Sequence, residues 1–301
     1  MPHLHHGALA SSGPRLLTLA IVLIALVYLR GWFRLRSISF SIASTWRAFS
    51  FLGGLGLIWV AVASPLAELD HELLTVHMLQ HLLLMTLAPP LVWLGAPLSS
   101  LLQGLPQRFL RRELGPLLRW PPLQTLGRVL GRPEFCWLAA AAALLGWHIP
   151  VIFTLGMQSA AWHLVEQASF LATGLLFWWP VVQPWPSVSQ PDLSIILYLF
   201  FATLPCDILS GFLVFCDRVV YPIYFSSSHL FGFTALGDQQ CAAALMWTCV
   251  TVVYLVAGAI LTMQLLSPQR SHEHVVMRPG SGATVELQRV VQSLGSLQHG
   301  D

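Results

Sequence analysis

The sequence has few charged residues and no lysine. Asp, Glu, Lys and Arg together make up 9% of its 301 residues, and all 15 basic residues are Arg, whereas soluble globular domains carry roughly 25% charged residues. A chain with so few charges and a net charge of only +2 lacks both the solvated surface of a soluble domain and the basic arm that nucleic-acid binding requires. We therefore exclude both classes and expect no nucleic-acid partner.

Several catalytic and redox patterns are also missing. The sequence contains no HExxH, no Ser elbow motif and no Gly-rich phosphate loop, so we assign no enzyme activity to it. Its five Cys include no CxxC pair. Cys216 and Cys241 lie near the same predicted membrane face and could form a disulfide, and the sequence leaves this pairing open.

Long apolar runs are what the sequence has in abundance. Hydrophobic residues make up 55% of the chain, and the mean hydropathy is +0.68. A helix needs about 20 residues to cross the hydrocarbon core of a bilayer, and seven runs are long enough. These runs lie at 14–32, 48–66, 72–94, 134–153, 160–182, 193–214 and 239–265. The sequence therefore predicts an all-α, polytopic integral membrane bundle of seven transmembrane helices.

The positions of Arg predict the orientation of these helices, because basic residues in short loops stay on the cytoplasmic side. Loop 30–47 carries four Arg, loop 95–133 carries six, and the C-terminal tail carries three, which leaves only Arg15 and Arg218 for the other side. An odd number of spans then places the N-terminus outside and the C-terminus in the cytoplasm.

The same analysis divides the chain into three parts. Residues 1–13 are expected to form a short periplasmic tail, 14–266 the membrane domain, and 267–301 a polar, disordered cytoplasmic tail. The N-terminal tail contains a histidine-rich HLHH stretch, which is either a metal-collecting segment or a simple solvated tail. The sequence leaves the role of these residues open: His3, His5 and His6.

Histidines and carboxylates gather at one predicted face of the membrane. Six His and three carboxylates fall at or near the outer ends of the spans, and no His falls at the inner ends. Scattered core histidines would divide between the two faces. The residues are His71, His77, His81, His148, His163, His229, Glu166, Asp207 and Asp238.

The segment 72–94 shows how some of these side chains can converge. Successive residues of a helix turn by about 100°, so His81 lies about 40° from His77, Met85 about 80° and Met78 about 100°. Imidazole is the commonest protein ligand for metals, and Met sulfur favours soft ions such as Cu(I). Nearby carboxylates can orient the ring N–H groups of the ligands or balance the charge of an ion. The pattern therefore indicates a metal site.

Other interpretations of the individual residues stay open. Two His separated by four positions, taken alone, more often serve helix packing or hydrogen bonding between helices than metal binding, and Met78 and Met85 can be packing residues. His next to Trp, as at Trp147–His148, is also typical of the aromatic belt at a membrane interface. The one-sided distribution of the whole set is what favours a site.

Five ordered motifs within 46–266 resemble the polytopic CtaG family of cytochrome c oxidase assembly factors, the integral-membrane type. In chain order these motifs are HMLQHLLLMTLAPPLVWLGAPL (77–98), GWHIPVIF (146–153), AWHLVEQASFLATGLLFWWPVV (161–182), RVVYPIY (218–224) and LGDQQCAAALMW (236–247). The resemblance implies a protein of the bacterial inner membrane that helps to form active haem-copper oxidase. It also implies functional roles for His77, His81, His148, His163 and Asp238. Gln167 departs from the family pattern, in which we expect a His after the Glu, and it cannot act as an imidazole ligand.

On this basis we predict an assembly factor that accepts copper on the outer face and delivers it to an oxidase subunit. Periplasmic copper chaperones and membrane lipid are expected as further partners. The predicted ligands are His77, His81, His148 and His163. Further ligands, or residues that orient the ligands, are expected among His71, Met78, Met85, Glu166, Asp207, His229 and Asp238.

Two alternatives remain at this stage. Facing histidines of spans 72–94 and 160–182 can instead bind haem b between helices, which would make the chain an electron-transfer protein. A copper transporter is the other alternative, which is weaker because only Glu134 and Asp192 lie near the inner ends of the spans.

Overall fold

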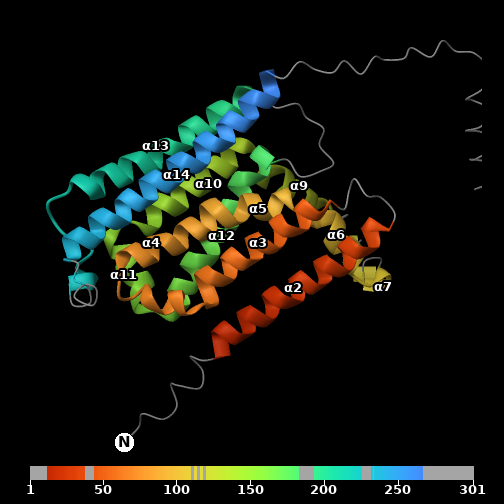
Figure 1. Cartoon of the computed structure of the whole chain (residues 1–301), viewed down its shortest axis with the longest axis horizontal. Helices are drawn as coiled ribbons and strands as arrows, with labels where there is room; N and C mark the ends of the chain where they lie inside the picture. Colours follow the sequence, from red (N-terminus) through yellow and green to blue (C-terminus); the bar gives the residue numbers. More distant parts are fainter. Residues whose placement is uncertain are drawn as a thin grey trace, which may run out of the picture. The chain divides into compact units, whose positions relative to one another are not determined.

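The computed structural model describes residues 12–37, 44–109, 112–113, 116–117, 120–182, 193–225, 232 and 234–266. The chain divides into two compact units, Met1–Leu265 and Leu266–Asp301, and everything below concerns the first unit. The part of the chain that the structure describes is helical and contains no strand. Figure 1 shows the helices, which are α2 Ser12–Arg36, α3 Thr45–Ala63, η1 Pro65–Leu69, α4 Leu74–Leu82, η2 Leu83–Leu87, α5 Ala88–Leu94, α6 Pro97–Gly104, α7 Gln107–Phe109, α9 Pro121–Leu130, α10 Pro133–Trp147, α11 Pro150–Gln158, α12 Ala160–Val182, α13 Leu193–Phe215, η4 Pro222–Phe225 and α14 Ala235–Leu266.

The helices confirm the all-α membrane class. Five segments are long and apolar enough to cross a membrane, and a sixth is obtained when α9 and α10, which are bent by 71° relative to each other, count as one. The five are Gly13–Arg36, Thr45–Leu69, Leu74–Leu94, Leu193–Phe215 and Ala235–Leu266. Helix α12 is also 23 residues long, but the polar residues in its first half lower its hydropathy. The count of seven spans and the orientation stay predictions.

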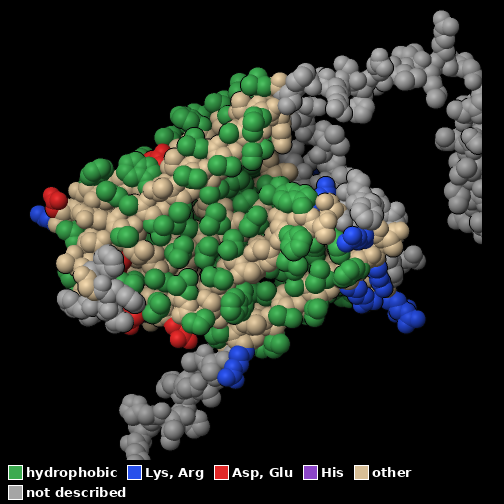
Figure 2. Space-filling view, viewed as in Figure 1, with side chains coloured by type: hydrophobic (Ala, Val, Ile, Leu, Met, Phe, Trp, Pro, Cys, Tyr) green, Lys and Arg blue, Asp and Glu red, His purple; other side chains and the backbone are tan. Residues whose placement is uncertain are grey.

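The surface of the bundle is consistent with a lipid environment. Large apolar side chains such as Phe49, Val151 and Phe215 are at least three-quarters exposed, which a soluble protein rarely tolerates over a wide area. Figure 2 shows apolar side chains over most of the visible face, with basic side chains mainly at the end near α6 and α7. Acidic side chains on this face lie mainly toward the opposite end.

Two apolar cores hold the bundle together. The smaller core joins α2 to α3 through Tyr28, whose ring stacks on Phe51 with centroids 4.0 Å apart and whose hydroxyl donates to the Gly95 carbonyl. Helix α6 also packs against α2. The larger core collects buried side chains from α4 and from α10 to α14, and the histidines discussed below lie within it.

The segment Leu74–Leu94 accommodates two prolines through a π-helical turn. Proline lacks an N–H donor and its ring clashes with the carbonyl four residues earlier, so Pro89 and Pro90 would break or bend a regular α-helix here. The structure instead widens at Leu83–Leu87, which relieves the clash by changing the hydrogen-bond spacing. Helix α12 approaches this turn closely at Gly174, where an added Cβ would lie 2.8 Å from the Met85 carbonyl oxygen.

The predicted span 134–153 is wrong at its second boundary. Helix α10 ends at Trp147, and a separate helix, α11, begins at Pro150. A residue that precedes proline is disfavoured in the α conformation, and Ile149 accordingly adopts extended angles, with φ −65° and ψ 123°. His148 follows directly after the last residue of α10 and caps its C-terminal end.

Candidate metal centre

Helices α4 and α12 bring together three buried side chains, which we call the His–Glu cluster: His77, His81 and Glu166. The Nε2 atoms of His77 and His81 lie 3.4 Å and 3.3 Å from the same oxygen, Oε1 of Glu166. Because the two histidines are four positions apart on one helix, both rings face α12 from adjacent turns. The three side chains are at most 6% exposed, and one nitrogen or oxygen from each lies within 4.8 Å of the others.

A second group shares His77 with the cluster. Here Asp70 and His163 join His77, again with one ligand atom of each within 4.8 Å of the others. The Nε2 atom of His163 lies 3.2 Å from Oδ2 of Asp70, and the rings of His77 and His163 are nearly parallel, with centroids 5.8 Å apart. The amide nitrogen of Gln167 lies 3.3 Å from the same Nε2 atom of His163. The arrangement therefore continues from the His–Glu cluster to a second carboxylate.

His148 adds a sulfur contact on the other side of the cluster. Its Nδ1 atom lies 2.7 Å from the Leu144 carbonyl oxygen, which indicates that Nδ1 carries the proton. Its Nε2 atom lies 3.2 Å from the Met78 sulfur, and its ring centroid is 6.0 Å from that of His81. His148 is thus a neighbour of the cluster, with its free nitrogen directed at a thioether.

Asp238 is not part of the cluster, but it binds the N-terminus of the helix that carries His77 and His81. Its carboxylate accepts hydrogen bonds from the backbone N–H groups of Leu74 and Thr75, at 2.7 Å and 3.1 Å, and from the Thr75 hydroxyl at 2.6 Å. The N-terminal N–H groups of a helix have no partner within the helix, so this carboxylate of α14 caps α4. The contact fixes the start of the helix that carries His77 and His81.

Two tyrosines that follow α13 hold the backbone around the cluster. Tyr221 donates to the carbonyl oxygen of His148 at 2.9 Å, and Tyr224 donates to that of Asp70 at 2.8 Å. Burial raises the pKa of Tyr221, and burial together with nearby carboxylates raises the pKa of Tyr224 well above its usual value. Both hydroxyls therefore remain neutral donors at physiological pH.

Among the residues that the structure describes, the polar atoms of the His–Glu cluster find no hydrogen-bond partner of good geometry. Both ring nitrogens of His77 and of His81, and both oxygens of Glu166, are buried without a partner of good geometry, although the separations of 3.3 Å to 3.4 Å allow electrostatic contact. A buried polar group without a partner costs about 1–3 kcal/mol. A cation held between these atoms would satisfy several of them at once, so the donor set fits a metal ion.

The remaining predicted residues do not all join the cluster. The His71 side chain is 53% exposed and lies at the rim, 3.6 Å from Asp70. Met85 is buried in the π-helical turn, and Asp207 is half-buried on α13 without any described contact to the cluster. His229 lies outside the described residues, as do the N-terminal histidines His3, His5 and His6. Cys216 and Cys241 are both free thiols.

Sequence reasoning missed Asp70 and Gly156. Asp70 is 1% exposed and lies in the turn between η1 and α4, where no helical periodicity marks it. Its only signal was its position next to His71, just before an apolar run. Gly156 on α11 faces Glu166, and a Cβ there would lie 2.9 Å from Oε2, so this glycine leaves room beside the carboxylate.

The comparisons with known proteins gave one match. A family model described as cytochrome c oxidase caa3 assembly factor matches residues 26–267, which include every residue of the His–Glu cluster and of its Asp70 extension. This match confirms the resemblance that the five sequence motifs indicated. No curated protein and no solved structure matched the chain.

Proposed function

This chain belongs to the family of cytochrome c oxidase caa3 assembly factors, and we propose that it binds copper at the His–Glu cluster and delivers it to an oxidase subunit. The observation that carries the proposal is the set of six buried nitrogen and oxygen atoms on His77, His81 and Glu166, none of which makes a hydrogen bond of good geometry with the described residues. Copper is then the cargo of the protein, and the proposed role is that of a non-catalytic metal chaperone.

The chemistry of the cluster suits an ion that must be bound and then released. Two imidazoles and one carboxylate form a borderline donor set for first-row transition metals, and the negative charge of Glu166 offsets the cost of burying a cation. Asp70 and His163 offer further metal-binding atoms between the His–Glu cluster and the exposed side chain of His71. An ion can therefore exchange ligands one at a time between the surface and the buried cluster.

The direction of delivery depends on the topology. We place the chain in the bacterial inner membrane with seven spans, the N-terminus outside and the C-terminus in the cytoplasm, because the Arg distribution favours this orientation. The His–Glu cluster then lies toward the periplasmic face. Periplasmic copper chaperones would supply the ion there, and the oxidase subunit would receive it on the same side.

The structure offers no observation that favours haem b at this position. His81 borders a cavity of only about 40 Å³, whereas pockets for cofactor-sized ligands measure roughly 300–1,000 Å³. The nitrogens of His77 and His81 also lie close to a carboxylate oxygen, which suits a small cation.

Complementation of a strain that lacks the gene tests the proposal. We expect His77→Ala/His81→Ala to reduce copper-loaded oxidase strongly, and we expect raised copper in the medium to restore part of the activity, because delivery then limits assembly. Asp217→Ala is the control, since this carboxylate is exposed and lies outside the His–Glu cluster and its Asp70 extension, and it should behave like the wild type. Equal oxidase activity in the double variant and the wild type, at limiting copper, would contradict the proposal.

A further inference from the structure

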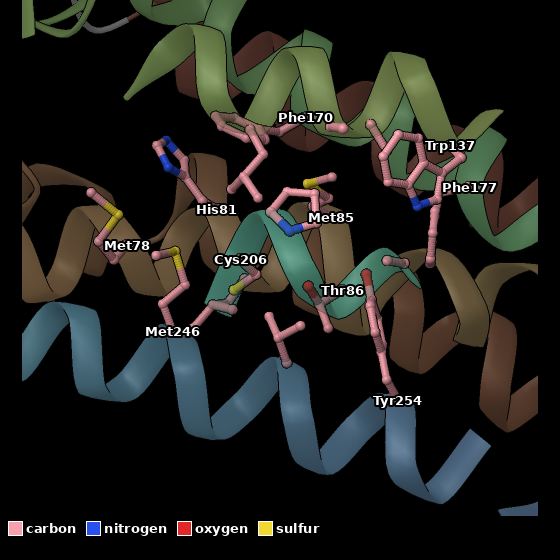
Figure 3. A pocket seen from close by; sticks show the side chains of 17 residues that line it. Met78, His81, Met85, Thr86, Trp137, Phe170, Phe177, Cys206, Met246 and Tyr254 are labelled. Carbon is pink, nitrogen blue, oxygen red and sulfur yellow. The ribbon is translucent and has the colours of Figure 1, made fainter. Parts of the chain in front are cut away.

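A cavity whose lining includes four sulfur-bearing side chains adjoins the His–Glu cluster at His81. Its volume is about 40 Å³, and its walls are mostly apolar. Water occupies sites of roughly 10–15 Å³ or more in this measure, so the space suffices for an ion or a few waters but for nothing larger. Figure 3 shows its sulfur-bearing side chains, which are Met78, Met85, Cys206 and Met246.

The sulfur-bearing side chains come from three separate parts of the sequence. Met78 belongs to α4, Met85 to the π-helical turn, Cys206 to α13 and Met246 to α14. All four residues are at most 9% exposed. Methionine is adaptable enough to fill gaps in a core, but only seven Met occur in the chain, and three of them converge on this one cavity.

The cavity is continuous with the His–Glu cluster through shared residues. His81 lies in the cluster and also lines the cavity. Met78 lines the cavity as well, and its sulfur lies 3.2 Å from Nε2 of His148. An ion can therefore pass from nitrogen and oxygen ligands to sulfur ligands without crossing a purely apolar layer.

We infer that this cavity is a second copper site, which takes Cu(I) on the sulfurs of Met78, Cys206 and Met246. Thioether and thiolate sulfur select Cu(I) over harder divalent ions, and the polar side chains in the lining, besides the borderline donor His81, are few and include Thr86 and Tyr254. The inference rests on the proposed function, because the His–Glu cluster would supply the ion.

The transfer between the two sites is a ligand exchange without a redox change. Bonds from Cu(I) to the nitrogens of the cluster break, and bonds to sulfur form. The S–H bond of Cys206 breaks as its sulfur binds the ion, and the proton leaves to the outer solution, as is general for thiol ligands. A Cu(I)–thiolate pair carries no net charge, which lowers the cost of holding the ion among apolar side chains.

The experiment uses the full-length chain, purified in detergent and titrated anaerobically with Cu(I) against a chromophoric Cu(I) chelator. X-ray absorption at the copper edge then separates sulfur from nitrogen and oxygen neighbours. The sulfur variant is Met78→Leu/Met246→Leu/Cys206→Ser, which nearly conserves volume. Its matched control, Met157→Leu/Cys136→Ser, changes a buried Met and a buried Cys that do not line the cavity.

The wild type and the control should bind two equivalents of Cu(I) and show sulfur neighbours, and the sulfur variant should bind one equivalent and show only nitrogen and oxygen. One equivalent in the wild type, with an unchanged spectrum in the sulfur variant, overturns the inference and leaves the proposed function standing. The variant His77→Ala/Glu166→Gln changes the His–Glu cluster but no residue that lines the cavity. If it keeps both equivalents, the proposed function fails while the sulfur site stands.

Discussion

The Nε2 atom of His81 on α4 lies 3.3 Å from Oε1 of Glu166 on α12. Glu166 is 1% exposed, and a carboxylate buried at this depth is costly unless a cation lies beside it. The two neighbouring imidazoles supply ring nitrogens that can act as ligands for such a cation. The packing of α12 on α4 thus determines that the negative charge of Glu166 lies beside the two imidazoles.

Removal of the Glu166 charge should weaken copper binding without unfolding the protein. Glu166→Gln keeps the shape of the side chain but loses the negative charge, so we expect the copper affinity to fall about 10- to 100-fold, as for groups that orient or balance metal ligands. Competition with a chelator measures this change. Glu134→Gln, at the start of α10, is the control, and equal affinities in both variants would argue against a role for Glu166.

Loss of the Asp238 cap should destabilise the start of α4. Asp238→Ala leaves two backbone N–H groups without their acceptor, while the Thr75 hydroxyl keeps only the backbone carbonyl of residue 238, so the free energy of unfolding should drop by about 1–3 kcal/mol. Thermal unfolding in detergent reports the difference as a lower Tm. The control Asp217→Ala changes an exposed carboxylate, and an identical Tm for the two variants would show that the cap is unimportant.

Two glycines with different surroundings should respond oppositely in stability when each is replaced by Ala. In Gly174→Ala the new Cβ would meet the Met85 Cα and carbonyl oxygen at 2.8 Å, so overpacking should destabilise the protein by about 1–3 kcal/mol. Gly211 on α13 has open space around it, and Gly211→Ala should instead stabilise the helix by up to about 1 kcal/mol. Thermal unfolding of both variants checks the signs, and a stabilising Gly174→Ala would contradict the packing described.

An imidazole at position 167 should strengthen metal binding. The Gln167 amide already points at Nε2 of His163, 3.3 Å away, so Gln167→His would create a second pair of histidines on adjacent turns. We expect tighter copper binding in a chelator competition assay. Ser169→His, two positions further along α12, places the ring on another part of the helix and is the control. An unchanged copper affinity in Gln167→His would show that position 167 does not take part in metal binding.

Local sequence patterns were sufficient for the part of the site that lies on one helix. The spacing of His77 and His81 fixes their common face through helix geometry alone. The position of Glu166 opposite them depends on how α12 packs on α4, which one sequence does not specify. Asp70 went unnoticed for a related reason, because it lies in a turn and acquires a partner only when His163 folds against it.

The prolines show the same division between local and tertiary causes. Pro150 carried enough local information to end α10 before it, and the predicted span 134–153 overlooked that signal. The π-helical turn before Pro89 was not predictable in this way, because a break, a bend and a widened turn all relieve the same clash. The close packing of Gly174 against Met85 is a feature of this outcome that only the folded helices reveal.

The copper content of the purified protein tests the central claim most directly. The wild-type chain, isolated with its native metal under reducing conditions, should carry stoichiometric copper by elemental analysis, and His77→Ala/His81→Ala should lose the copper held by the His–Glu cluster. The rim variant His71→Ala should keep the wild-type content. Full copper occupancy in the double variant, or zinc in place of copper in the wild type, would contradict the account.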